Sequence, residues 1–132
     1  MILVDSNVLL DVFTADPKWG SWSAASLEEW ARRGPLVIDP PIYAELGAGF
    51  DSIEALEAAS EEAGLRFEEI SREALFLAGK AHLAYRRRGG TRVGVLADFF
   101  IGAHAAVSRM PILTRDVSRY QAYFPTVVLV CP

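Results

Sequence analysis

The chain has 132 residues, 52% of them apolar, and a formal net charge of −4. This length and apolar content are typical of one folded domain, and we predict a single domain over residues 1–132. The net negative charge excludes a nucleic-acid binder that depends on bulk attraction, so any bound RNA or DNA would need local arginines or metal ions.

Membrane insertion and secretion are not expected. No apolar run approaches the roughly 20 residues that span a bilayer, and no basic region precedes the first apolar run. Cys131 is the only cysteine, so no internal disulfide can form. We therefore predict a cytoplasmic protein without a membrane partner.

The N-terminal segment indicates a strand followed by a helix. Ile2 to Val4 is a short, unbroken apolar run, typical of a strand that is buried on both faces in a parallel sheet. Asp5 follows directly, and we expect Ser6 or Asn7 to cap a helix over residues 8–13. Asp5 then lies at the carboxyl end of a central strand, where open α/β sheets bind their ligands.

Strands and helices are expected to alternate along the rest of the chain. Ser71 is predicted to cap a long helix, and Asp51 with Glu54 has the spacing of a capping box. The predicted helices cover 23–33, the segment after Pro41, 51–63, 71–88 and 98–108, and the predicted strands cover 36–38, 65–70, 112–114 and 127–130. This order predicts an α/β fold, with a mainly parallel, five-stranded sheet between two layers of helices.

Four carboxylates lie in unusually apolar surroundings: Asp5, Glu45, Asp98 and Asp116. Each has a purely structural interpretation, because Asp5 or Asp98 could cap a helix, Glu45 could face water and Asp116 could form an Asx-turn. As a group they indicate a site for Mg²⁺ or Mn²⁺, since these ions prefer oxygen ligands and their charge offsets the repulsion between carboxylates.

Three other features are weighed beside the acids. His104 lies six residues after Asp98, about 120° round a helix from it, so we interpret it as a packing or surface residue. Gly102 is on the same helix face as Asp98 and would let backbone or substrate approach closely. The basic run from Arg86 to Arg92 is either a solvated helix end or a contact for RNA phosphate. The possible RNA contacts are Arg86, Arg87, Arg88, Arg92 and Arg115.

The acidic segments together resemble the four motifs of PIN-domain ribonucleases, and most closely those of VapC toxins. The matching segments are Leu3-Val-Asp-Ser-Asn-Val-Leu-Leu10, Tyr43-Ala-Glu-Leu46, Leu96-Ala-Asp-Phe-Phe-Ile-Gly-Ala-His-Ala105 and Leu113-Thr-Arg-Asp116. The tail from Arg115 to Pro125 also fits the usual ending of the family. The resemblance keeps the order of the motifs and spans almost the whole chain.

The resemblance implies a PIN-like fold, a Mg²⁺- or Mn²⁺-dependent endoribonuclease, a translation-inhibiting toxin, a homodimer and a VapB-type antitoxin as partner. It maps Asp5, Glu45, Asp98 and Asp116 onto the catalytic acids, and Asn7 and Thr114 onto the polar positions beside them. We expect Asp5, Asp98 and Asp116 to bind the metal, and Glu45 to bind a second ion or to orient the attacking water.

Two alternatives remain open. A haloacid dehalogenase-type phosphatase also has an Asp after its first strand, but it requires a second Asp two residues on, where this chain has Asn7. A non-catalytic module would use the same acids to bind an antitoxin's arginine, and it would neither bind Mn²⁺ nor cut RNA.

Overall fold

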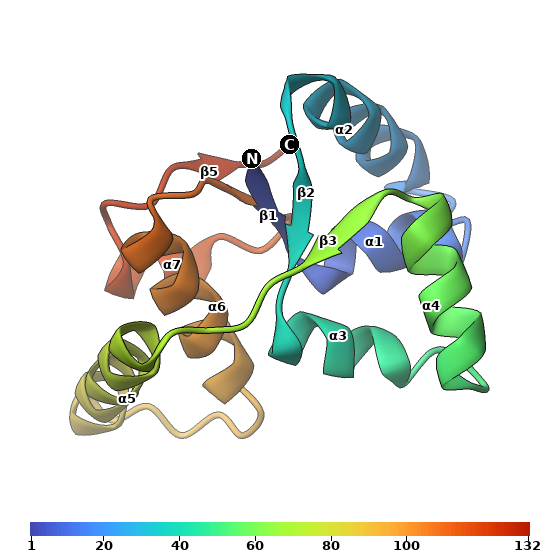
Figure 1. Ribbon diagram of the computed structural model, residues 1–132. Coiled ribbons are helices and arrows are strands. Elements are labelled where there is room, and N and C mark those ends of the chain that lie inside the picture. The colour runs from blue at the N-terminus through green and yellow to red at the C-terminus, as the bar shows by residue number, and fades with distance from the viewer.

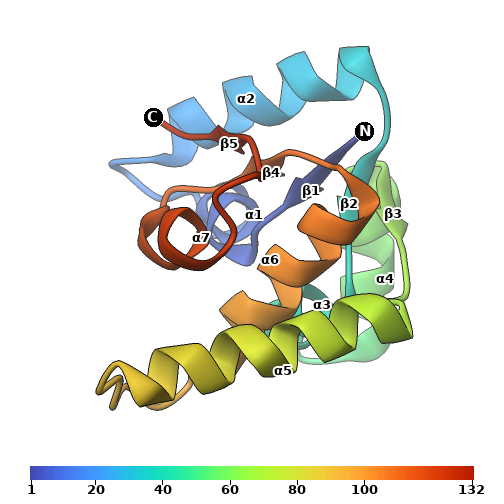
Figure 2. The same cartoon turned by 90° about the vertical axis from the view of Figure 1, so that its left-hand side faces the viewer.

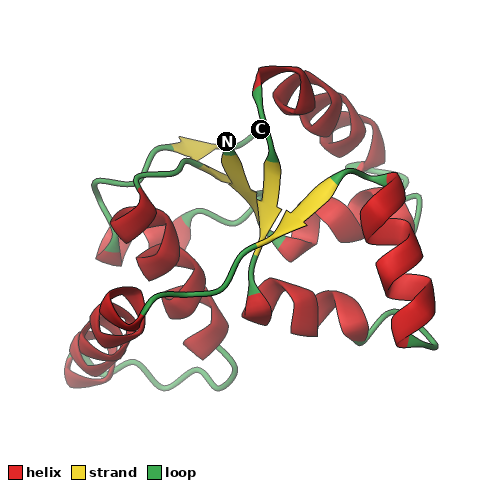
Figure 3. Ribbon diagram, in the orientation of Figure 1, coloured by secondary structure: helices red, strands yellow, loops and turns green.

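A computed structural model describes residues 1–132 and contains a five-stranded sheet between helices (Figures 1 and 3). The strand order is β3-β2-β1-β4-β5, and every neighbouring pair is parallel. The strands are β1 (Ile2–Val4), β2 (Leu36–Ile38), β3 (Leu65–Phe67), β4 (Ile112–Leu113) and β5 (Leu129–Val130). The predicted five-stranded α/β fold is confirmed, and the sheet is parallel throughout.

The three inner strands, β1, β2 and β4, are buried on both faces. Ile2, Leu3 and Val4 are fully buried, with Leu3 opposite Val37 on one side and Ile112 on the other. Continuous apolar runs are what such strands require, since no residue of a strand covered on both faces points to water. The edge strands β3 and β5 are more exposed.

Seven helices flank the sheet. They are α1 (Ser6–Phe13), α2 (Gly20–Arg33), α3 (Pro40–Gly47), α4 (Ile53–Glu62), α5 (Arg72–Arg87), α6 (Leu96–Ser108) and α7 (Ser118–Tyr123). Figure 1 shows α1, α2 and α4 on one side of the sheet and α5, α6 and α7 on the other. Figure 2 shows α5 lying along the outside of α6. None of these helices combines the length and apolarity that crossing a bilayer would take.

Several element ends differ from the prediction by a few residues. Asp5 itself is the N-cap of α1, because its carboxylate accepts a hydrogen bond from the amide of Ser6, which is already helical. The cap of α4 is Ser52 rather than Asp51, with the serine oxygen accepting from Ala55 N. The elements α2, α3 and α6 begin earlier than predicted, and strands β3, β4 and β5 are shorter.

The short helix α7 was not predicted, and it is held against α6 by ring packing. A Cβ atom on Gly102 would overlap the ring of Phe124, which follows α7. The close approach expected at Gly102 is therefore made by this aromatic side chain and not by a substrate. It fixes the position of α7 beside the carboxyl ends of the strands.

The strand order places a topological switch point between β1 and β4. The chain continues from β1 to β2 on one side of it, while β4 and β5 lie on the other. In open α/β sheets, ligands bind outside the carboxyl ends of the strands at such a point. Asp5 and Thr114 directly follow the two strands that flank it.

Candidate active site

Asp5 is buried at the carboxyl end of β1 and is held by three donors. Its Oδ1 accepts from Ser6 N at 2.8 Å, and its Oδ2 accepts from Thr114 Oγ1 at 2.9 Å and from the Tyr120 hydroxyl at 2.8 Å. Burial raises the pKa of Asp5, and the negative charge of Asp98 raises it further, while the hydrogen bonds partly oppose the shift. This carboxylate is therefore costly to keep ionised without a cation nearby.

Asn7 and Thr114 support the position of Asp5. Asn7 Nδ2 donates to Thr114 Oγ1 at 3.2 Å, and Asn7 Oδ1 accepts from the backbone amide of Arg115 at 3.1 Å. Thr114 is fully buried and in turn donates to Asp5. The two residues thus join the start of α1 to the end of β4, next to the acid, as expected for the polar positions of the motif.

Glu45 reaches the same region from the last turn of α3. Its Oε1 accepts from the hydroxyl of Ser6 at 3.1 Å. Partial burial of the carboxylate raises the pKa of Glu45, and the charges of Asp5, Asp98 and Asp39 raise it further. The charges of Asp5 and Asp98 therefore reach Glu45, and the charge of Asp98 also reaches Asp5.

Asp98, in the first turn of α6, is paired with an arginine. Arg119 Nε donates to Asp98 Oδ2 at 2.6 Å, and the two side chains are only 16% and 25% exposed. Burial disfavours the charged guanidinium, but the bond to Asp98 and the charges of Asp98 and Asp116 raise the pKa of Arg119. The positive charge at this edge of the sheet thus comes from α7.

Asp116 adopts the local arrangement that the sequence left open as an alternative. It is exposed, and its Oδ1 accepts from Ser118 N at 3.4 Å and from Ser118 Oγ at 3.0 Å, which is an Asx-turn. Its side chain is not hydrogen-bonded to the other three acids, but its backbone N and O are hydrogen-bonded to Thr114 Oγ1 and its charge attracts Arg119.

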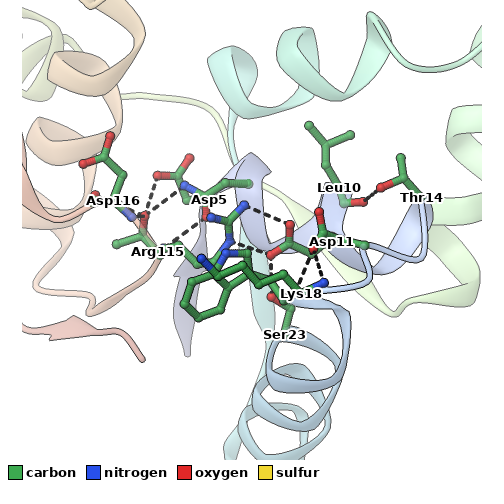
Figure 4. A network of polar contacts seen from close by, with 12 residues as sticks. Asp5, Leu10, Asp11, Thr14, Lys18, Ser23, Arg115 and Asp116 are labelled. Atoms are coloured by element: carbon green, nitrogen blue, oxygen red, sulfur yellow. Dashed lines mark hydrogen bonds and ion pairs between the residues drawn. The ribbon is translucent and has the colours of Figure 1, made fainter.

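Arg115 has a structural partner on the opposite side of this edge. Figure 4 shows it reaching from the segment after β4 toward Asp11 and Ser23. Its Nε and Nη2 donate to the two oxygens of buried Asp11 at 2.6 and 2.9 Å, and Ser23 Oγ also donates to Asp11. The guanidinium lies over the ring of Trp19 as well. These contacts join α1, α2 and β4, so the structure gives Arg115, a possible RNA contact in the sequence, a packing role.

The arginines at the end of α5 are exposed, as both interpretations of them require. The guanidinium of Arg88 lies 5.3 Å from the centre of the Tyr123 ring of α7. Tyr85 packs against the same ring from the last turns of α5. The basic end of α5 is therefore next to α7 and, through it, close to Arg119 and Asp98.

His104 is buried and takes no part in the acid group. Its Nδ1 is 2.9 Å from Asp39 Oδ2, and Asp39 is fully buried and also accepts from Ile42 N. The interpretation of His104 as a packing residue is confirmed. The pair joins α6 to the end of β2 and the start of α3, the helix that carries Glu45.

The arrangement fits a divalent cation in the chemistry of its donors but is not a preformed metal site. No group of three or more His, Cys, Asp or Glu side chains is placed so as to hold an ion. The donors Asp5, Glu45 and Asp98 are nevertheless hard oxygen ligands whose mutual repulsion a cation would relieve.

Sequence reasoning missed two residues of this site, Arg119 and Tyr120. Both lie in the tail that resembles the family's usual ending, but nothing in their local pattern indicates that they face carboxylates more than 20 residues away. The one available signal was that a buried acid requires a donor or a cation.

The fold and the acid edge define the class to which this chain belongs. The family model described as PIN domain matches residues 2–124, nearly the whole chain. The protein therefore belongs to the PIN domain family. This match argues against the haloacid dehalogenase-type phosphatase.

Solved structures of toxin–antitoxin complexes share the fold. A chain of VapBC2 from Rickettsia felis, bound to a promoter DNA fragment, aligns with a TM-score of 0.76 and 18% identity over 100% of this chain and 99% of that one. A chain of VapBC-1 from nontypeable Haemophilus influenzae aligns with a TM-score of 0.74 and 21% identity, over 99% of this chain and 98% of that one. A chain of FitAcB from Neisseria gonorrhoeae aligns with a TM-score of 0.70 and 21% identity, over 98% of this chain and 96% of that one. No curated protein shows significant similarity in sequence.

Proposed function

We propose that this protein is a Mg²⁺- or Mn²⁺-dependent endoribonuclease, and the VapC-type toxin of a toxin–antitoxin pair. One observation carries the proposal: Asp5, Glu45 and Asp98 come from three separate segments to the carboxyl edge of the sheet, where the charge of Asp98 reaches both other acids. Carboxylates gathered at a switch point, in a member of the PIN domain family, are suited to metal-assisted phosphodiester hydrolysis.

Each acid has a proposed role. Asp5 and Asp98 would hold the ion, Asp116 would bind it directly or through water, and Glu45 would hold a second ion or orient the attacking water. A bound Mg²⁺ or Mn²⁺ supplies a water of lowered pKa and neutralises charge on the phosphodiester. Thr114 and Asn7 would keep Asp5 in place, because the bonds between them are already formed in the structure.

The RNA would be bound by local positive charge, since the whole chain is acidic. The arginines at the end of α5 and in the loop after it are the proposed contacts: Arg86, Arg87, Arg88 and Arg92. They are exposed, and Arg88 contacts α7, which carries the partner of Asp98. Phosphate contacts of this kind position a nucleic acid without reading its sequence.

The proposed partners follow from the resemblance and from the structural neighbours. Those neighbours are described as VapBC and FitAcB assemblies, and we propose a VapB-type antitoxin and homodimer formation for this chain as well. Cleavage of RNA in the cytoplasm would inhibit translation, and the antitoxin would restrain it.

The test compares two carboxylates that occupy the same kind of position. Asp98 is in the first turn of α6, and Glu73 is an exposed acid in the first turn of α5, away from the site. With Mn²⁺ present, the Asp98→Asn variant should lose RNA cleavage while keeping its circular dichroism spectrum, and Glu73→Gln should cleave like the unmodified chain. Full cleavage by folded Asp98→Asn would refute the assignment.

The Arg119–Asp98 ion pair favours one second candidate, a non-catalytic module whose acids bind an antitoxin's arginine. It demonstrates that Asp98 accepts a guanidinium in this setting. A titration with Mn²⁺ separates the two functions, because a chain that binds no Mn²⁺ and leaves RNA intact in its presence would be the binding module.

A further inference from the structure

Helix α7 contributes two neighbouring residues to the acid edge, and each binds a carboxylate from a different element. Arg119 Nε donates to Asp98 Oδ2 at 2.6 Å, and the Tyr120 hydroxyl donates to Asp5 Oδ2 at 2.8 Å. The site thus contains an internal cation in the place where the proposed function requires a metal ion.

Arg119 is built into the structure rather than loosely attached. Its side chain is 16% exposed, and Tyr123 of the same helix packs edge-on against Phe99 and Tyr85, with ring centres 5.3 and 6.1 Å away. Phe99 directly follows Asp98 in α6. The same aromatic packing therefore fixes the distance between the arginine and the aspartate.

The pairing with Arg119 conflicts with metal binding at Asp98. An oxygen that accepts a guanidinium N–H at 2.6 Å cannot bind a divalent cation at the same position, and the guanidinium repels that cation. On the basis of the proposed function, we propose that Arg119 is a resident counter-ion that competes with the divalent metal for Asp98, so that metal binding requires its displacement.

The charges of the site predict how loss of Arg119 would change the stability and the metal affinity of the chain. The charge of Asp98 already disfavours ionised Asp5 and Glu45, and Arg119 is the cation bonded to it. Without Arg119, Asp98 is free and the edge is more negative. The metal-free protein then becomes less stable, and its affinity for a divalent cation rises.

The experiment measures Mn²⁺ affinity of the metal-free full chain by electron paramagnetic resonance. Arg119→Gln should bind Mn²⁺ about tenfold more tightly than the unmodified chain, a factor that corresponds to about 1.4 kcal/mol. Arg119→Lys, which keeps the charge, should lie closer to the unmodified chain. Arg72→Gln is the matched control, because Arg72 is exposed at the start of α5 and binds no acid, so its Mn²⁺ affinity should not change.

The outcomes separate this inference from the proposed function. If the unmodified chain binds Mn²⁺ and Arg119→Gln binds it no more tightly than Arg72→Gln, the competition is refuted while metal dependence stands. If neither the unmodified chain nor any variant binds Mn²⁺, both the competition and the proposed metal dependence are wrong. If Arg119→Gln does not fold, the Nε–H resonance of Arg119 in ¹⁵N-labelled unmodified protein decides: saturating Mg²⁺ should shift it, and an unchanged resonance would overturn the inference.

Discussion

The Arg115–Asp11 pair supports a quantitative prediction about stability. Asp11 is 3% exposed, and Arg115 binds both of its oxygens while Ser23 donates one further hydrogen bond. The Arg115→Met substitution keeps a long apolar side chain but leaves the buried carboxylate with the serine alone. Removing one partner of a buried pair costs about 3–5 kcal/mol. Because the Arg115 side chain is 27% exposed, solvent moderates the loss, and we expect about 2–3 kcal/mol.

Urea denaturation at neutral pH measures this loss, and a double-mutant cycle with Asp11→Asn isolates the interaction. We expect a coupling free energy of about 1–2 kcal/mol between the two positions. Arg87→Met is the control, since Arg87 is exposed at the end of α5 and should change stability by no more than about 0.5 kcal/mol. A loss below about 0.5 kcal/mol in Arg115→Met would show that the guanidinium is free in solution. Arg115 would then return to the set of candidate RNA contacts.

Three further predictions test other parts of the structure. The pKa of Asp5 is higher in the folded chain than in the unfolded chain, where it is about 3.9. Between these two pKa values the folded chain keeps the Asp5 proton and the unfolded chain has lost it, so the free energy of unfolding falls as pH rises. Asp5→Asn removes this contribution, and the unmodified chain should lose stability relative to the variant as pH rises above about 4 in urea titrations; a constant difference would contradict the raised pKa. Gly102→Ala should cost about 1–3 kcal/mol because the ring packed on it must shift, whereas Gly79→Ala, in open space on α5, should stabilise the chain by about 0.5–1 kcal/mol. His104→Leu leaves the buried Asp39 carboxylate without its side-chain partner and should lower stability by about 1–3 kcal/mol in thermal denaturation; an unchanged melting temperature would contradict the pairing.

The inner strands were predictable because their burial requires a continuous apolar run, which is visible in the local sequence. Residues 2–4 and 36–38 are covered on both faces, and a continuous apolar run bounded by polar or turn residues is the consequence. Helix α7 has no comparable local pattern, since six residues are too few to show helical periodicity. Its position depends on a ring packed against a glycine far away in the chain.

The candidate site was predictable in its location but not in its bonding. Topology requires residues that follow β1 and β4 to lie together, and this brought Asp5 and Thr114 to one edge. The partner of Asp98 depends on where α7 docks, which no local pattern reports. For Asp116 the Asx-turn was one of the alternatives that the sequence left open, and in the structure Ser118 N and Ser118 Oγ donate to its carboxylate.

The internal partners of the acids lead to a prediction about metal removal. Asp5 has three donors, Glu45 has a serine hydroxyl, Asp98 has Arg119, and Asp116 has its own turn. Because these bonds offset the repulsion between the carboxylates, the chain should fold without a divalent ion. Chelation by EDTA should leave its circular dichroism spectrum unchanged, and Mn²⁺ at 100 times its dissociation constant should add only the stability that binding contributes, about 2.7 kcal/mol. Loss of secondary structure on chelation would show that the ion, and not these hydrogen bonds, holds the acid edge together.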